Sequence, residues 1–235
     1  MATLSAIRAQ LRALINEPDP NNSHFSDSDF NEYINEAQTF LAAYIEYPRT
    51  IVSTQVTAGT ANYSLPSDSI SIITVYFGDL AIANDIRVLR VLNEESLKTI
   101  YPSWLSTDST SRGRPRFAFL KERTILTLIP TPDADNAVTG KKYHLNYIQT
   151  PAALSSDSDT PELPLPYHDL LQFYAAHLAY LNLQVQEMAD KMMASFSEKI
   201  KALQAEVNKE SKEALSWQWT YNEDVSGETF GGITF

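Results

Sequence analysis

The chain has 235 residues, 43% of them hydrophobic, which is enough for one large domain or two small domains with a hydrophobic core. It contains no cysteine, which excludes disulfide bonds, thiolate metal sites and a cysteine nucleophile, and which fits synthesis in a reducing cytoplasm. Its 29 acidic residues outnumber its 18 basic residues, and the net charge of −11 disfavours tight binding to the phosphates of nucleic acids.

Residues 1–8 do not resemble a secretory signal, because they lack a basic patch followed by a continuous apolar run. No apolar segment approaches the length that is needed to span a membrane. We therefore expect a soluble protein with no membrane contact, which is not exported by a cleaved signal.

Two amphipathic helices are predicted in the first 50 residues. Apolar side chains recur every three or four positions over residues 4–15, and two prolines then end the first helix. Ser26 is placed to cap the second helix, with Asp29 completing a capping box. Phe25 and Phe30 have the spacing of a hydrophobic staple across the same turn.

The period of the apolar pattern changes from near four to two after residue 50, and β-branched residues become frequent. Three turns or hairpins are predicted: 51–57 with 63–66, 70–77 with 80–83 across Gly78, and 117–120 with 125–129. Two further strands, 86–91 and 143–148, and a short helix 94–101 capped by Asn93 complete this region. The pattern favours a compact antiparallel sandwich or barrel that is inserted between helices.

The segment 166–217 has the strongest helical periodicity, with one buried stripe and a charged outer face. Two antiparallel helices with a break near 182–186 fit this stripe, and one bent helix fits almost as well. The predicted fold class is α+β: an α-helical bundle of N- and C-terminal helices, an inserted antiparallel β domain and an extended C-terminal tail. The predicted parts are the N-terminal helices at residues 1–50, the inserted β domain at 51–150 and a linker at 151–165. The C-terminal helices at 166–217 and the extended tail at 218–235 follow.

The sequence carries no recognisable catalytic or metal-binding motif. Its four histidines lack the spacing of a metal-binding helix, and it has no Gly-rich phosphate loop. Asp157 and Asp159 alternate as in a calcium loop, but the glycine and the distal glutamate of such a loop are missing. We expect a non-enzymatic protein with no cofactor and no metal, although two carboxylates brought together by folding would leave a glycosidase open.

Arg112, Arg114 and Arg116 form the one local basic patch of this acidic chain. They are interpreted either as a solvated loop or as a docking patch for an acidic protein surface, because guanidinium groups hold carboxylates in a fixed geometry.

The last part of the chain is rich in aromatic residues that follow neither a helical nor a strand period. Such side chains are typical anchors in protein interfaces. They either fold back on the chain's own helices or bind a partner. The predicted partner-binding residues are Trp217, Trp219, Tyr221, Phe230 and Phe235.

Five short motifs occur in an order that resembles the head-to-tail adaptor proteins of tailed bacteriophages. They are Met-Ala-Thr-Leu-Ser-Ala-Ile-Arg at residues 1–8, Phe-Ser-Asp-Ser-Asp-Phe-Asn-Glu-Tyr-Ile-Asn-Glu-Ala at 25–37, Leu-Thr-Leu-Ile-Pro-Thr-Pro at 126–132, Tyr-His-Leu-Asn-Tyr-Ile-Gln-Thr-Pro at 143–151, and Leu-Pro-Leu-Pro-Tyr-His-Asp-Leu-Leu at 163–171.

The resemblance implies a helical bundle with an inserted β domain, assembled as a dodecameric ring beneath the portal of the virion. Such a ring extends the DNA channel without binding DNA specifically, and it offers a platform for the tail or nozzle protein. It also implies that the C-terminal aromatic residues named above reach the portal. Two alternatives remain: a tail-completion or nozzle subunit, and a carbohydrate-binding or cell-wall-hydrolysing module that holds a sugar on aromatics such as Trp104.

Overall fold

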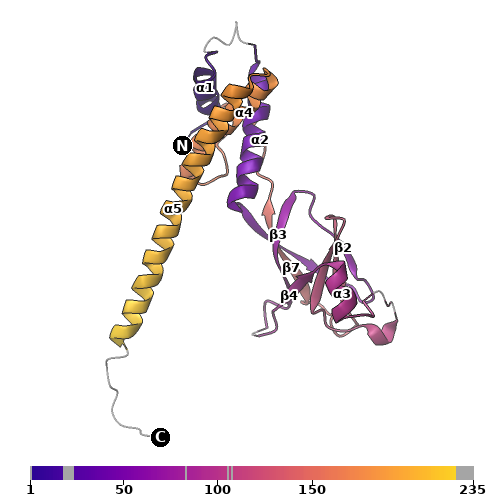
Figure 1. Ribbon diagram of the computed structural model, residues 1–235. Helices are drawn as coiled ribbons and strands as arrows, with labels where there is room; N and C mark the ends of the chain where they lie inside the picture. The colour runs from indigo at the N-terminus through magenta and orange to yellow at the C-terminus, as the bar shows by residue number, and fades with distance from the viewer. Residues whose placement is uncertain (1, 18–23, 83, 105, 107, 226–235) are drawn as a thin grey trace. The chain divides into compact units, whose positions relative to one another are not determined.

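The structure is a computed structural model that describes residues 2–17, 24–82, 84–104, 106 and 108–225, with side chains described as far as residue 206 (Figure 1). It has five α-helices and seven strands in this part of the chain, which confirms the predicted α+β class. The chain divides into two compact units, residues 1–37 with 154–235 and residues 38–153. We call the first the helical unit and the second the β unit.

The helical unit contains α1 (Leu4–Leu14), the first part of α2 (Asp27–Ile45), α4 (His168–Asn182) and α5 (Gln186–Val225). In α1, the predicted stripe is buried: Leu4, Ile7 and Leu11 have no exposed surface. The same holds for Phe30 and Ile34 on α2. These apolar faces form because their side chains recur at helical spacing, as the sequence predicts.

The predicted capping box of α2 is present. The Asp29 N–H donates to Ser26 Oγ at 3.2 Å, and the Ser26 N–H donates to Asp29 Oδ2 at 2.8 Å. The Phe25 and Phe30 rings lie with their centroids 5.5 Å apart across this turn, as a hydrophobic staple requires. The hydrogen bonds from Ser26, chiefly the one from its side chain, lower the pKa of Asp29.

Ser26→Ala is expected to lower the free energy of unfolding of the helical unit by about 1 kcal/mol, because the Asp29 N–H loses its acceptor. Urea denaturation followed by circular dichroism measures the change. Ser28→Ala is the matched control. Ser28 is exposed and lies two residues after Ser26, inside α2, where alanine has the higher helix propensity. Equal losses in both variants would contradict a role for the cap.

The break between α4 and α5 confirms the two-helix interpretation of 166–217. Gln184 has a positive φ of 59°, and the Val185 N–H donates to the Tyr180 carbonyl at 3.0 Å, so the chain turns sharply. The two helices pack through Tyr174 and Phe196, whose ring centroids are 5.6 Å apart. Two aromatic side chains of the predicted stripe thus meet across the turn.

Helix α5 continues to Val225, whereas the sequence analysis expects an extended tail from residue 218. The backbone of 218–225 is therefore helical, and residues 226–235 lie outside the described part. The physical reason is the composition of α5, which contains neither glycine nor proline and so gives no signal to end the helix.

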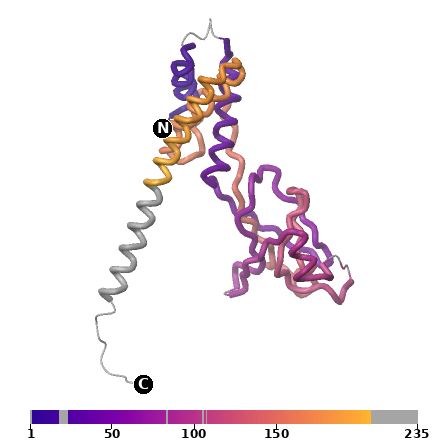
Figure 2. The backbone as a smooth tube through the Cα atoms, in the orientation of Figure 1, coloured from indigo at the N-terminus to yellow at the C-terminus, as the bar shows by residue number. Residues whose placement is uncertain are grey.

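Most of the segment predicted as a linker, residues 151–165, belongs to the helical unit. The backbone carbonyls of Asp159 and Asp157 accept the N–H groups of Leu4 and Ser5 at 2.8 and 3.2 Å, and so satisfy the first turn of α1. Asn35 on α2 exchanges two hydrogen bonds with the backbone of Leu154, at 3.0 and 2.7 Å. Figure 2 shows this part of the chain running alongside α2.

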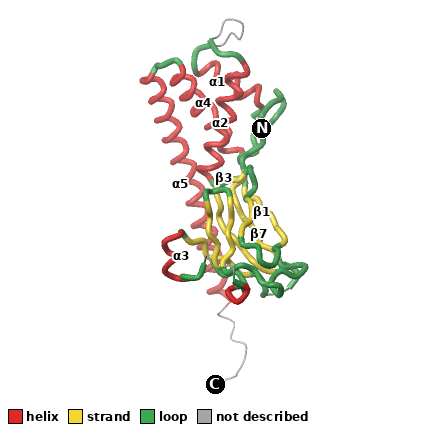
Figure 3. Tube along the Cα trace, turned by 90° about the vertical axis from the view of Figure 1, so that its right-hand side faces the viewer, coloured by secondary structure: helices red, strands yellow, loops and turns green. Residues whose placement is uncertain are grey.

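The β unit is one seven-stranded sheet in the order β1-β7-β3-β4-β5-β6-β2 (Figure 3). Its elements are β1 (Arg49–Gln55), β2 (Asn62–Ser64), β3 (Ser69–Gly78), β4 (Arg87–Leu92), α3 (Glu94–Ile100), β5 (Phe117–Lys121), β6 (Ile125–Ile129) and β7 (Lys142–Gln149). The predicted hairpin of β5 and β6 and the Asn93 cap of α3 are confirmed.

Three predictions about this sheet are wrong. The sheet is mixed, because β4 and β5 pair in parallel across a connection that contains α3. Strand β2 pairs with β6 and not with β1. Residues 80–82 of the predicted strand 80–83 form a turn, because the Asp79 carboxylate accepts the Ala81 N–H at 2.9 Å, and residue 83 lies outside the described residues.

The sheet curls around one core. Residues from both of its halves share this cluster, including Val75 and Phe77 on β3, Leu126 and Leu128 on β6, and Leu145 on β7. The rings of Tyr63 and Tyr143, on strands near opposite ends of the order, lie 5.1 Å apart. The ends of the sheet are thus close, but β1 and β2 form no ladder with each other among the described residues.

Candidate functional site

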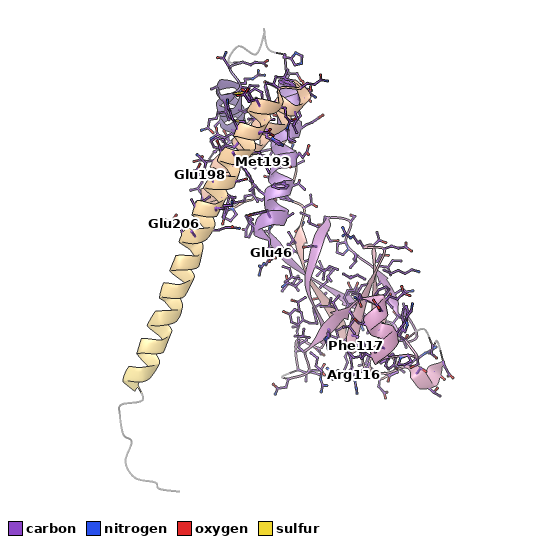
Figure 4. The ribbon with its side chains drawn as sticks, viewed as in Figure 1. Glu46, Arg116, Phe117, Met193, Glu198 and Glu206 are labelled. Atoms are coloured by element: carbon purple, nitrogen blue, oxygen red, sulfur yellow. The ribbon has the colours of Figure 1, made fainter. Side chains whose placement is uncertain are left out.

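The two units differ strongly in charge. The β unit has 11 basic and 10 acidic residues, whereas the helical unit has seven basic and 19 acidic residues. Arg8 and Arg12 are already engaged by Asp157 and Asp27, at 2.7 and 2.6 Å. Figure 4 shows Glu198 and Glu206 along α5 of this unit. The excess negative charge of the protein therefore belongs to its helical unit, while the β unit is nearly neutral.

The basic patch predicted from the sequence divides into two kinds of residue. Arg114 is a structural residue: its Nη1 lies 3.0 Å from Asp85 Oδ1, its Nη2 donates to the Asp85 carbonyl, and its guanidinium lies 5.8 Å from the Phe77 ring centroid. Arg112 and Arg116 are exposed. Figure 4 shows Arg116 next to Phe117 at the start of β5. The guanidinium of Arg112 lies against Gly59, so a docking patch would rest chiefly on Arg116.

Asp85 is the centre of a charged cluster between β3 and β4. Besides Arg114, its carboxylate contacts Lys141 Nζ at 3.4 Å and accepts the Asp79 N–H at 2.7 Å. That backbone hydrogen bond, followed by the cations of Arg114 and Lys141, holds the pKa of Asp85 below its ordinary value, while partial burial acts in the opposite direction. The cluster ties three segments of the β unit together.

Asp85→Asn is expected to make the stability of the β unit less dependent on pH. Because the pKa of Asp85 is lowered on folding, its charge contributes stability above the unfolded pKa, and this contribution is lost as the pH falls through the folded pKa. The urea midpoint of the parent should exceed that of the variant at neutral pH. The difference between the two midpoints should begin to shrink below about pH 4, and it should vanish once the pH has fallen through the folded pKa of Asp85. A difference that is constant with pH would contradict the argument.

The predicted partner-binding aromatics fall beyond the described side chains. Trp217, Trp219 and Tyr221 belong to the last turns of α5, of which the structure describes the backbone alone. Phe230 and Phe235 lie outside the described residues. Their role in binding a partner stays a prediction.

Trp104, the residue proposed to hold a sugar, is half-buried. Its ring packs edge-on against Phe119 at 5.7 Å and belongs to the small cluster around Leu92, Leu97 and Ile129. It also forms one wall of a cavity of about 580 Å³, together with polar groups that include Asn62, Glu94 and Lys121. The main role of the Trp104 ring in the structure is therefore to pack within the β unit.

The titratable groups that the sequence analysis considers for chemistry have structural partners. His144 contacts Ser53 Oγ at 2.7 Å and the Gly78 carbonyl at 3.3 Å, and His168 contacts the Leu163 carbonyl at 2.7 Å. Asp159 accepts two backbone N–H groups of its own turn, from Ser155 and Ser156, both at 2.8 Å. Within the described residues, no group of three or more histidines and carboxylates is placed to hold a metal ion.

One feature of the surface is missing from the sequence-based candidates. Strand β1 lies at the edge of the sheet, and among the strands that the structure describes it pairs only with β7 (Figure 3). Its residues alternate between exposed and half-buried, and Ile51 is 61% exposed. The uncharged run from Thr50 to Gln55 could have indicated an unprotected edge strand. The predicted pairing of this strand with residues 63–66 excluded that interpretation.

None of the helices in the described part of the chain combines the length and the apolar character that crossing a bilayer requires. The chain matches no curated protein. The family model described as SU10 adaptor protein matches residues 2–218, which include the β unit and most of the helical unit. The chain belongs to the SU10 adaptor proteins, a family of phage head-to-tail adaptors, and its role is structural, in the virion.

Proposed function

We propose that this adaptor assembles as a dodecameric ring beneath the portal, extends the DNA channel and provides the attachment platform for the tail or nozzle protein. The family match over residues 2–218 carries the proposal. The C-terminal aromatic residues, from Trp217 to Phe235, contact the portal or the neighbouring subunit. Of the predicted docking patch Arg112, Arg114 and Arg116, the exposed side chain of Arg116 is the one offered to an acidic partner surface.

The segregation of charge supports a role beside DNA. A wall that carries net negative charge offers no cations to replace the counterions of DNA, so DNA passes without adhering. The helical unit, with 19 acidic against seven basic residues, suits this wall, while the nearly neutral β unit suits contacts with other proteins. Repulsion between neighbouring helical units has to be offset by apolar contacts within the ring.

The test is the position and copy number of the chain in purified virions, measured by cryo-electron microscopy. The proposal expects a closed ring of twelve copies that touches the portal on one side and a tail or nozzle protein on the other. A chain that lies at the distal end of the tail would favour the nozzle or tail-completion alternative. A monomer without affinity for any virion component would overturn the proposal.

A second candidate, a carbohydrate-binding module, is supported by the cavity beside Trp104. Its mixed wall of aromatic, amide and charged groups resembles the lining of a small polar-ligand site. Glycan binding by the purified chain that is lost in Trp104→Ala, but kept in Trp217→Ala, would favour this candidate. The half-buried packing of the ring favours the structural role instead.

A further inference from the structure

Strand β1 has an open backbone edge. It pairs with β7 over all seven of its residues, from Arg49 opposite Ile148 to Gln55 opposite Lys142. Half of its backbone N–H and C=O groups therefore point away from β7. From Arg49 to Thr54, no residue that the structure describes forms a hydrogen bond with these outward groups. The outer side of β1 thus presents a row of backbone donors and acceptors, from Arg49 to Thr54, that no described residue uses.

This edge lacks the features that normally protect an edge strand. Proteins block such edges with lysine, proline, bulges or very short strands. Strand β1 has neither lysine nor proline, its register with β7 is regular, and Thr50–Thr54 carries no charge. The other edge of the sheet, β2, has only three residues. Among the residues that the structure describes, one edge is thus protected by its shortness and the other is left available.

We propose that residues 229–235 of a neighbouring copy bind along the outer edge of β1 and extend the sheet by one strand. The proposal rests on the ring assembly proposed above, and it assigns the last aromatic residues of each chain to the next subunit.

The length of α5 argues for a neighbouring copy. Its 40 residues correspond to roughly 60 Å, whereas the 15 residues of α4, which packs beside its beginning, correspond to about 22 Å. The terminal residues are therefore connected to a helix that runs well past the partner helix of its own unit. In a ring, each copy would offer its terminal segment to the next copy, a head-to-tail contact that closes.

The sequence of the segment suits this edge. Thr229-Phe230-Gly231-Gly232-Ile233-Thr234-Phe235 has the same number of residues as β1 and no charged side chain. In an extended strand, Ile233 and Phe235 share one face, where they would cover the exposed Ile51. Backbone hydrogen bonds supply the affinity in this mode of recognition, and alternate side chains supply the specificity. The two glycines let the backbones approach closely.

The test uses single cysteines in the full-length chain, which has none of its own. Chains with Ile51→Cys and chains with Ile233→Cys are mixed, assembled on portal-bearing capsids and treated with a short bifunctional maleimide. The proposal expects a dimer in which mass spectrometry joins position 51 of one chain to position 233 of another. The double variant should give chains linked in series and no internally linked monomer.

Ile51→Lys and Val88→Lys form a matched pair for the edge itself. Both side chains are β-branched and exposed, at 61% and 64%, but Val88 lies on β4 in the interior of the sheet. In a chain that also carries Thr54→Cys, Ile51→Lys should lower the cross-link to position 233 about tenfold, because a lysine disfavours pairing at an edge, and Val88→Lys should not.

Four results would overturn the inference: linkage within one chain, linkage of position 51 to position 51, linkage of position 233 to the portal, or no linkage in rings that attach normally. In each of these cases the proposed ring still stands. Failure of the unmodified chain to assemble on the portal would instead overturn the proposed function itself. The two failures are therefore distinguishable in one set of samples.

Discussion

Deletion of residues 218–235 is expected to abolish attachment of the adaptor to portal-bearing capsids while both units stay folded. The deletion removes Trp219, Tyr221, Phe230 and Phe235, each of which would contribute about 2 kcal/mol when it is buried in an interface. Losing even two such anchors would weaken binding roughly a thousandfold. Because a ring binds through many equivalent contacts, the loss in each copy is multiplied in the assembly.

Co-sedimentation of purified chain with adaptor-free capsids measures the effect. A full-length variant with alanine at the same four aromatic positions should fail as the deletion does, which separates the side chains from the length of the chain. Glu223→Ala with Asp224→Ala is the matched control: it changes the same segment, keeps every aromatic residue and should attach normally. Normal attachment of the deleted chain would remove the C-terminal residues from the mechanism.

Phe77→Ala is expected to have the largest effect on stability, a loss of about 3–5 kcal/mol in the free energy of unfolding of the β unit. Phe77 has no exposed surface, lies in the core that the curled sheet surrounds, and supports the guanidinium of Arg114. A loss of this size is a large part of the 5–15 kcal/mol that typically stabilises a protein. The variant should therefore open the β unit at moderate temperature.

Hydrogen exchange read by mass spectrometry locates the loss. Amides of β3, β6 and β7 should lose protection, whereas amides of α1 and α4 should keep it, because the helices bury their own apolar faces. Tyr76→Ala is the control: this neighbour on β3 is half-buried and lies on the opposite face of the strand, so its loss should be less than half as large. An equal loss of protection in both units would show that they unfold together.

The helices of this protein are largely predictable from the sequence. The caps at Ser26 and Asn93, the stripe of α1 and the turn between α4 and α5 each depend on residues within about five positions of one another. Local interactions of this kind are visible in a linear pattern. The end of α5 is the exception, since the aromatic residues after position 216 suggested an interface before they suggested a helix.

The pairing of the strands could not be read in the same way. An alternating pattern identifies a strand such as β2, but its partner β6 lies about 60 positions away, and nearby β1 has an equally suitable pattern. The parallel contact of β4 with β5 depends on how α3 crosses between them. Arg114 shows the same limit for a site: its internal contact with Asp85 joins residues that are 29 positions apart.

The sequence by itself determined the class of the fold, the positions of the helices and nearly all strands, the excess of acidic residues and the order of motifs that the adaptor family shares. These properties follow from composition and from interactions between near neighbours along the chain. Only the tertiary structure decided that the sheet is mixed and open at β1, and that Arg114 is used internally. Each of these depends on contacts between residues far apart in the sequence, whose partners a linear pattern does not specify.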